Sequence, residues 1–292
     1  MNERSMVLAG GFALALIAAP AAPAQETPPG RPTTVAPDAP AGGGAATDEA
    51  AQAADIAKKL SNPVAALISV PLQNNWDYGI GTTNAMKYTL NIQPVVPLSI
   101  SKEWNVIIRT IVPIIDAEST VPGGSMSSGL GDITQSFFFS PKEPTSGGWI
   151  IGAGPAILYP SASHDAIGAG KWAAGPTIVV LKQEHGFTYG VLANQLWSFA
   201  GWGPTSVNAM FLQPFLTFTT KKYTTFGLNT ESTYNWTSSE WTVPINASVT
   251  QLLKIKKQII SLQFGYRYYA TAPTGGPNHG WRFALTLVFP KK

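Results

Sequence analysis

The chain has 292 residues, a formal net charge of +3 and no cysteine, and only 12% of its residues are charged. Soluble domains carry about 25% charged residues, so this composition indicates an exterior that largely avoids water. The missing cysteines exclude disulfides and thiolate metal sites, and the small net charge without a basic run argues against a nucleic-acid partner.

The first 24 residues have the pattern of a secretory signal peptide. Arg4 supplies a positive start, an apolar run follows over residues 7–19, and Ala-Pro-Ala at 22–24 offers the small residues that a signal peptidase reads. This run is too short to span a bilayer, and no later stretch approaches the about 18 apolar residues that a spanning helix needs. We therefore expect a secreted chain.

Two further segments precede the main domain. Residues 25–47 are mostly Pro, Ala, Gly and Thr, and because they cannot bury enough surface to offset the entropy of ordering, we predict a disordered linker. Residues 48–62 predict a short helix, with acids at its start, bases near its end, and Ile56 and Leu60 on one face. This helix either rests in the periplasm at the mouth of the next domain or plugs its interior.

Over residues 63–292 the hydrophobic pattern has a period of two, which indicates β-strands. The pattern is clearest at 224–236, 241–251 and 258–270, where large apolar or aromatic side chains alternate with small or polar ones. These runs match the about 9–11 residues of a tilted membrane-spanning strand and exceed the about 5–6 of an average soluble strand. Aromatic residues gather near the strand ends, as they do at the two interfaces of a bilayer.

The strand pattern predicts an all-β fold, a transmembrane antiparallel up-and-down β-barrel of about 12 strands. The strands lie near 66–78, 85–96, 104–116, 129–140, 149–160, 171–183, 187–198, 208–220, 224–236, 241–253, 258–270 and 281–290. Long connections alternate with tight ones, and an even strand count places both termini in the periplasm of a Gram-negative bacterium. Because proline lacks a ladder donor, we interpret six prolines as bulges or strand ends: Pro94, Pro113, Pro155, Pro176, Pro214 and Pro244.

Long motifs in this region resemble a known family. They are NPVAALISVPLQNNWDYGIG at 62–81, NIQPVVPLSISKEWNVIIRTIVPII at 91–115, GLGDITQSFFFS at 129–140, LANQLWSFAG at 192–201, the segment 211–236 ending in LNTESTYNW, and WTVPINASVTQLLKI at 241–255. The family comprises predicted bacterial outer-membrane transporters often mislabelled "neuromedin U", related to a putative family of the meta pathway of phenol degradation. The resemblance covers 62–290 and implies an outer-membrane barrel with a transport role, without functional residues.

No constellation for catalysis stands out. The three histidines, His164, His185 and His279, fall in separate predicted loops or turns and lack the spacing of a metal site or a catalytic base. A barrel phospholipase would need a histidine and a serine on neighbouring strands, and no predicted strand contains a histidine. We therefore predict no enzymatic activity, no metal and no cofactor.

Alternation also places charged and amide side chains on the inner face of the barrel, where a charge avoids the about 2–4 kcal/mol cost of facing lipid near the midplane. The lumen-lining candidates are Lys87, Arg109, Asp132, Glu231, Arg267, Arg282, Gln213, Asn229 and Gln263. They predict a passive channel or transporter for small solutes, with anionic and aromatic ones as candidates. Outer-membrane lipid and the barrel assembly machinery are the expected partners. The alternative is a non-conducting structural or adhesive barrel, filled by charge pairs and an N-terminal plug.

Overall fold

The computed structural model describes residues 43–256 and 258–289. The predicted signal peptide and residues 25–42 of the predicted linker lie outside the described residues. Within the described ranges, no helix combines the length and the hydropathy needed to cross a membrane.

The helix α1 spans Gly43–Leu60 and so begins before residue 48, where we expected its start. Its first half is rich in alanine, the residue with the highest helix propensity, which explains the earlier start inside the predicted linker. Asn62 and Pro63 end it as expected, because the residue before a proline is pushed out of the helical region.

Fifteen strand segments follow, all in one antiparallel sheet. They are β1 Ile68–Ile80, β2 Ala85–Ile92, β3 Val95–Ser99, β4 Trp104–Ala117, β5 Ser127–Leu130, β6 Ile133–Pro141, β7 Trp149–Tyr159, β8 Lys171–Glu184, β9 Phe187–Gly201, β10 Asn208–Thr219, β11 Thr224–Thr230, β12 Ser232–Asn235, β13 Glu240–Ile255, β14 Gln258–Thr271 and β15 His279–Phe289.

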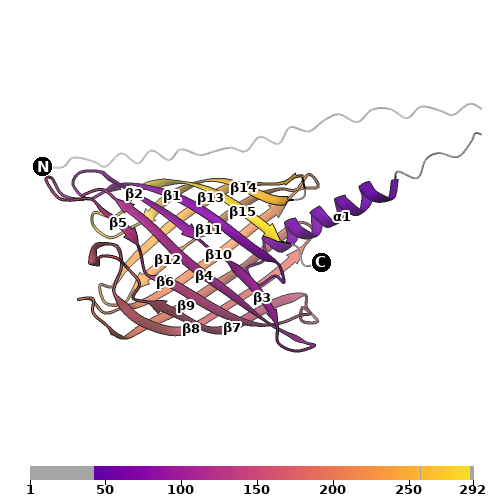
Figure 1. The fold of residues 1–292 in the computed structure, drawn as a ribbon, viewed down its shortest axis with the longest axis horizontal. Coiled ribbons are helices and arrows are strands. Elements are labelled where there is room, and N and C mark those ends of the chain that lie inside the picture. Colours follow the sequence, from indigo (N-terminus) through magenta and orange to yellow (C-terminus); the bar gives the residue numbers. More distant parts are fainter. Residues whose placement is uncertain (1–42, 257, 290–292) are drawn as a thin grey trace, which may run out of the picture. The chain divides into compact units, whose positions relative to one another are not determined.

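Three pairs of segments are halves of interrupted strands: β2 with β3, β5 with β6, and β11 with β12. The sheet therefore has twelve strands, as the sequence predicts. Each strand pairs with its neighbour along the chain, and β1 pairs with β15 from Ile68↔Phe289 to Tyr78↔His279. This last pairing joins the two ends of the sheet and closes the barrel (Figure 1).

The prolines behave in two ways. Pro94 lies in the interruption between β2 and β3, and Pro244 lies at a register shift in β13, as predicted. Pro113 lies opposite the interruption between β5 and β6, where the register shifts by one residue, as predicted. Pro155, Pro176 and Pro214 lie within continuous strands, so interpreting these three as bulges or strand ends was wrong. Pro155 of β7 and Pro176 of β8 are direct register partners, which concentrates two missing donors at one point of the wall.

The connections differ between the two ends of the barrel. We call the end that holds Ile68 and Phe289 the terminal end; its turns at 100–103, 185–186 and 220–223 have two to four residues, and its longest described connection, 142–148, has seven. At 185–186 both residues have positive φ, the geometry of a two-residue type I′ hairpin turn. The opposite loop end carries the two longest connections, 118–126 and 160–170, together with 202–207 and 272–278 and the short turns 81–84 and 236–239.

The outer wall of the barrel is apolar and its inner face is polar over much of the circumference. On β11 the outward Phe226 and Leu228 are each 51% exposed, and on β14 the outward Phe264 is 58% exposed. The inward Asn246 and Arg267 are 4% and 9% exposed. This inversion of the soluble-protein pattern is the signature of a barrel whose exterior contacts lipid.

His279 is the first residue of β15 and not part of a loop, which corrects our placement of that histidine outside the strands. Its ring stacks on Tyr78, with the ring centroids 5.5 Å apart, and on Tyr266 at 6.3 Å. The histidine thus belongs to an aromatic group near the loop end, and aromatic contacts explain its strand position.

Candidate functional site

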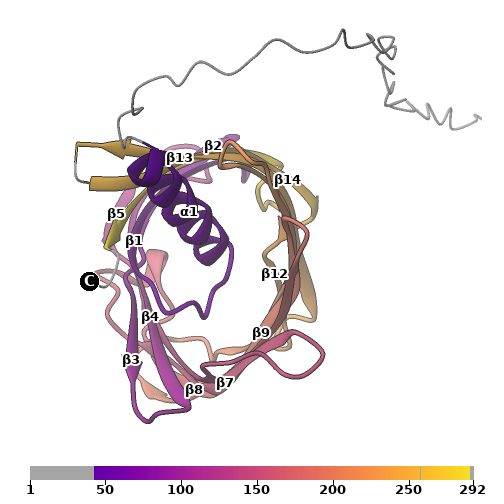
Figure 2. The ribbon, with the colours of Figure 1, turned by 90° about the vertical axis from the view of Figure 1, so that its right-hand side faces the viewer.

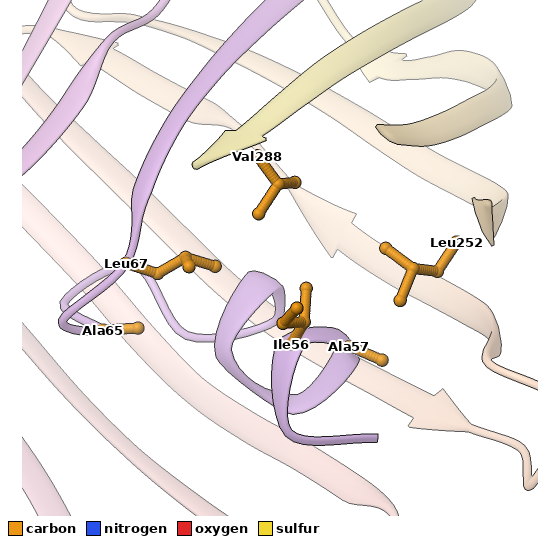
Figure 3. Close-up of a cluster of buried hydrophobic side chains, with 6 residues drawn as sticks. All are labelled: Ile56, Ala57, Ala65, Leu67, Leu252 and Val288. Atoms are coloured by element: carbon orange, nitrogen blue, oxygen red, sulfur yellow. The ribbon is translucent and has the colours of Figure 1, made fainter. Parts of the chain in front are cut away.

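The C-terminal half of helix α1 packs at the mouth of the barrel at its terminal end, and the helix extends outward from there (Figure 1 and Figure 2). Ile56 and Ala57 of the helix are buried against Leu252 of β13 and Val288 of β15, and Leu67 completes the cluster (Figure 3). Two hydrogen bonds reinforce the contact, because Tyr223 Oη donates to the Ala50 carbonyl at 2.9 Å and Gln183 Nε2 to the Lys58 carbonyl at 2.9 Å.

The segment 61–67, between the helix and β1, crosses to the opposite wall. Val64 is buried there in a second apolar cluster formed by Ile107, Phe138, Val179, Leu181 and Leu192. Gly152 leaves the space that Val64 occupies, since a Cβ at that glycine would lie 3.1 Å from Val64 Cγ1. We call α1 together with 61–67 the N-terminal segment. Its buried residues Ile56, Ala57 and Val64 contact the inner wall at the terminal mouth.

A cavity of about 290 Å³ lies beyond the N-terminal segment. Residues 57–67 line it on one side and the polar inner face of the barrel on the other. The barrel side consists mainly of amides and hydroxyls: Ser69, Gln73, Gln93, Gln213, Thr217, Thr225, Asn229, Ser248, Thr250, Ser261, Gln263 and Thr286. Among its lining residues only Lys59 and Arg109 are charged. We call this space the lumen cavity.

Ion pairs join several strands of the inner face farther along the lumen. Arg282 donates from Nη1 and Nη2 to the two carboxylate oxygens of Glu231, at 2.8 and 2.7 Å. Arg267 lies 3.7 Å from Glu231 and 3.4 Å from Asp77. Asn75 Oδ1 accepts from Arg282 Nε at 2.7 Å and from Arg267 Nη1 at 3.2 Å. These five residues form the lumen charge cluster.

The geometry of the cluster offsets the cost of burying charge. The fork-to-fork contact between Arg282 and Glu231 satisfies both carboxylate oxygens, and this is the strongest geometry available to such a pair. Tyr269 adds a donor to Asp77 at 2.9 Å, and its ring lies 5.4 Å from the guanidinium of Arg267. Because low-dielectric surroundings penalise a lone ion, removing one member leaves the others costly to bury.

The remaining charged candidates face the lumen outside this cluster. Lys87 is the cross-strand partner of Asp77. Arg109 donates from Nη2 to Gln93 Oε1 at 2.9 Å. Counting Lys87, Arg109, Arg267 and Arg282 against Asp77 and Glu231, the inner face keeps the cationic excess that the sequence indicates.

The three amide candidates all line the lumen cavity. Asn229 Oδ1 accepts from Asn246 Nδ2 at 2.8 Å, and Gln263 Nε2 lies 3.3 Å from Ser248 Oγ. Gln213 lines the cavity from β10. The alternation of the sequence thus placed these amides on the correct face.

Asp132 does not join the other candidates. It lies between β5 and β6, and its carboxylate accepts from the backbone amides of Ala162, Ala169 and Gly170 at 3.0, 2.6 and 3.1 Å. It therefore holds the 160–170 connection in place at the loop end. Asp132 therefore anchors this loop. The sequence did not predict that role, because the strand pattern gives the face on which a residue lies but not which loop covers it.

Sequence reasoning missed three polar residues of the lumen. Asn75 and Asp77 continue the inward alternation that begins at Gln73 of β1. They alternate with Trp76 and Tyr78, whose aromatic side chains marked this stretch as a strand end. Gln93 adjoins the interruption at Pro94, where the period of two is lost. Extending the alternation of inward and outward residues along the whole of β1 would have placed Asn75 and Asp77 on the inner face.

A closed twelve-stranded barrel with an apolar exterior and a polar lumen defines the class of porin-like outer-membrane β-barrels. No protein-family model matches the sequence, and no curated protein matches it. Among solved structures, the fold resembles an outer-membrane channel from Pseudomonas putida F1, with a TM-score of 0.59 and 12% identity over 76% of this chain and 94% of that one.

Two porins are also similar in structure, at lower scores. The NanC porin matches with a TM-score of 0.47 and 11% identity, over 76% of this chain and all, 100%, of that chain. The KdgM porin, solved in complex with disordered oligogalacturonate, matches with a TM-score of 0.44 and 12% identity, over 76% of this chain and 99% of that chain. At such identities the likeness concerns the fold.

Proposed function

We propose that the protein is a passive channel for small polar solutes in the bacterial outer membrane. The lumen cavity is the observation that carries this proposal, since a barrel built only for support would gain stability by filling the space with side chains. The amides and hydroxyls of its lining replace the hydration of a polar solute, and they favour such a solute over an aromatic one.

The same proposal includes the family to which the motifs in 62–290 point, the mislabelled "neuromedin U" transporters. It also includes the orientation. The start of β1 and the end of β15 lie at the terminal end, away from the two longest connections, and bacterial barrels keep their longer loops outside the cell. Outer-membrane lipid and the barrel assembly machinery are then the partners of the folded and the folding chain.

The N-terminal segment makes the channel narrow at its terminal mouth. The test compares the full chain with a variant that lacks residues 43–60, each reconstituted in a planar bilayer. We expect the deletion variant to show larger conductance steps, because α1 no longer occupies the mouth. Well-folded protein that gives no steps in either form would refute the proposed channel.

The alternative function is a non-conducting structural barrel. One observation favours it: the segment 61–67 reaches the opposite wall, where Val64 is buried among apolar side chains. A second deletion, of residues 43–67, removes this contact as well. If the barrel stays closed in both deletion variants, the charge cluster itself blocks the lumen and the structural function holds.

A further inference from the structure

Arg109 differs from the other lumen arginines in its partners. Arg267 and Arg282 both lie within ion-pair distance of Glu231, at 3.7 and 2.7 Å. Among the described residues Arg109 has no such carboxylate, and its guanidinium donates to the neutral side chain of Gln93 at 2.9 Å. A guanidinium carries five N–H donors in a planar fork, so the hydrogen bond to Gln93 uses only one of the five donors of Arg109.

Arg109 lines the lumen cavity, and no acidic residue does so among the described residues. The other charged lining residue, Lys59, is paired with Asp55 at 2.7 Å on the surface of α1. The cavity therefore has one cation without an anion. In addition, the buried hydroxyl of Thr217, in the same lining, has no hydrogen-bond partner.

We propose that the lumen cavity binds a small organic carboxylate with a neutral polar body, and that Arg109 holds its carboxylate. The inference rests on the proposed channel function, which brings solutes into this cavity. A planar guanidinium matches a carboxylate with two parallel hydrogen bonds, a geometry that a point charge such as lysine does not offer. The bound anion supplies the contact ion pair that Arg109 lacks among the described residues, since Glu231 acts on Arg109 only from beyond ion-pair distance.

The rest of the lining suits the body of such a solute. Gln213, Asn229 and Gln263 face the same space and offer amide donors and acceptors to hydroxyl or amide groups. The volume of about 290 Å³ lies near the lower limit of the about 300–1,000 Å³ typical of small-molecule sites. The cavity therefore selects molecules of the size of a single sugar acid.

The charge cluster does not work against an anion here. Glu231 is neutralised in place by Arg282, at 2.7 Å, and by Arg267, at 3.7 Å. The excess positive charge of the inner face thus acts on the cavity without an opposing free carboxylate. This arrangement attracts an anion without trapping it, because only one guanidinium lies in the lining.

Equilibrium binding tests the site without requiring conduction. The full chain is purified in detergent, and its folded state is checked by the mobility shift between boiled and unboiled samples. Isothermal titration then measures binding of gluconate, with glucose as the neutral analogue and sulfate as an inorganic anion. The variants are Arg109→Gln and Arg109→Lys, with Lys222→Gln as the matched control, which removes the same charge from an exposed turn.

We expect gluconate to bind the wild-type chain and the Lys222→Gln control with equal affinity, and glucose to bind far more weakly. Arg109→Gln should weaken gluconate by about tenfold or more, and Arg109→Lys by less, because hydrogen bonds to a charged partner are strong. Equal binding by wild type and Arg109→Gln, equal binding of sulfate and gluconate, or no binding at all would overturn the carboxylate site. Conductance measurements judge the channel separately.

Discussion

Glu231 lies where a backbone interruption and a buried carboxylate coincide. The pairs Thr230↔Ile245 and Thr233↔Thr242 place Glu231 opposite Pro244, which has no backbone donor. The strand is therefore interrupted between β11 and β12. At this interruption the side chain of Glu231 accepts two hydrogen bonds from Arg282. Side-chain bonds thus reinforce the barrel at a point where the backbone ladder is weak.

We expect Glu231→Gln to destabilise the barrel strongly. The substitution leaves Arg282 and Arg267 buried without their shared carboxylate, a change that costs about 3–5 kcal/mol in buried pairs. Unfolding in guanidinium chloride, followed by intrinsic tryptophan fluorescence, should show a lower midpoint. The control Glu240→Gln removes the same charge from an exposed position at the start of β13 and should leave the midpoint unchanged. Coincident curves for both variants would contradict the role given to Glu231.

The carboxylate of Asp132 should govern the order of the 160–170 connection. Asp132→Asn replaces one acceptor oxygen by a donor that faces backbone N–H groups, which now repel it. We expect subtilisin to cleave this connection faster in the variant while the rest of the barrel stays resistant. Asp165→Asn, an exposed change in the same connection, is the control, and equal cleavage rates would show that Asp132 does not anchor the loop.

Individual residues also show how far sequence reasoning extends. Strand alternation predicts the face of a side chain, so it found Arg267, Arg282 and Glu231 on the inner face. It does not predict depth or what a loop brings over the strand end, and it therefore placed Asp132 in the lumen. The contact between Arg282 and Glu231 joins strands that are not neighbours, which only the closed geometry of the barrel reveals.

At the scale of elements, the strands were largely predictable from their period and their turn residues. The positive φ values at His185 and Gly186 show why that turn is so short and so visible in the sequence. The interruptions in β5–β6 and β11–β12 were not predictable, because they depend on neighbours across the sheet. The docking of α1 was left open by its sequence, and contacts with Leu252 and Val288 decide it.

Expelling α1 by a single substitution should imitate its deletion. Ile56 is 2% exposed in the apolar cluster at the terminal mouth, so Ile56→Asp buries an unpaired charge and the helix leaves the mouth. We expect conductance steps in a planar bilayer to grow toward those of the variant lacking 43–60. Asp55→Asn alters the exposed pair with Lys59, which contributes little, and should leave the steps unchanged. Wild-type conductance in Ile56→Asp would show that the docked helix does not limit the channel.

The orientation of the whole barrel can be tested in intact cells, because the sequence contains no cysteine. Ser125 is exposed in the 118–126 connection at the loop end, and Lys222 is exposed in a turn at the terminal end. With a membrane-impermeant maleimide, we expect Ser125→Cys to be labelled on whole cells and Lys222→Cys only after the outer membrane is broken. The reverse labelling pattern would show that the terminal end faces the outside of the cell.

Pairing of β1 with β15 joins the first and last strands of the chain. The ring can therefore close at this seam only after β15 has been made. Asn75 and Asp77 belong to one side of the seam, Arg267 and Arg282 to the other. Only the contacts of the two arginines with Asn75 and Asp77 cross the seam, because Glu231 lies on the same side of it as both arginines. Because β1 directly continues the N-terminal segment, and that segment contacts Val288 of β15, closure of the seam and docking of the segment involve the same two strands.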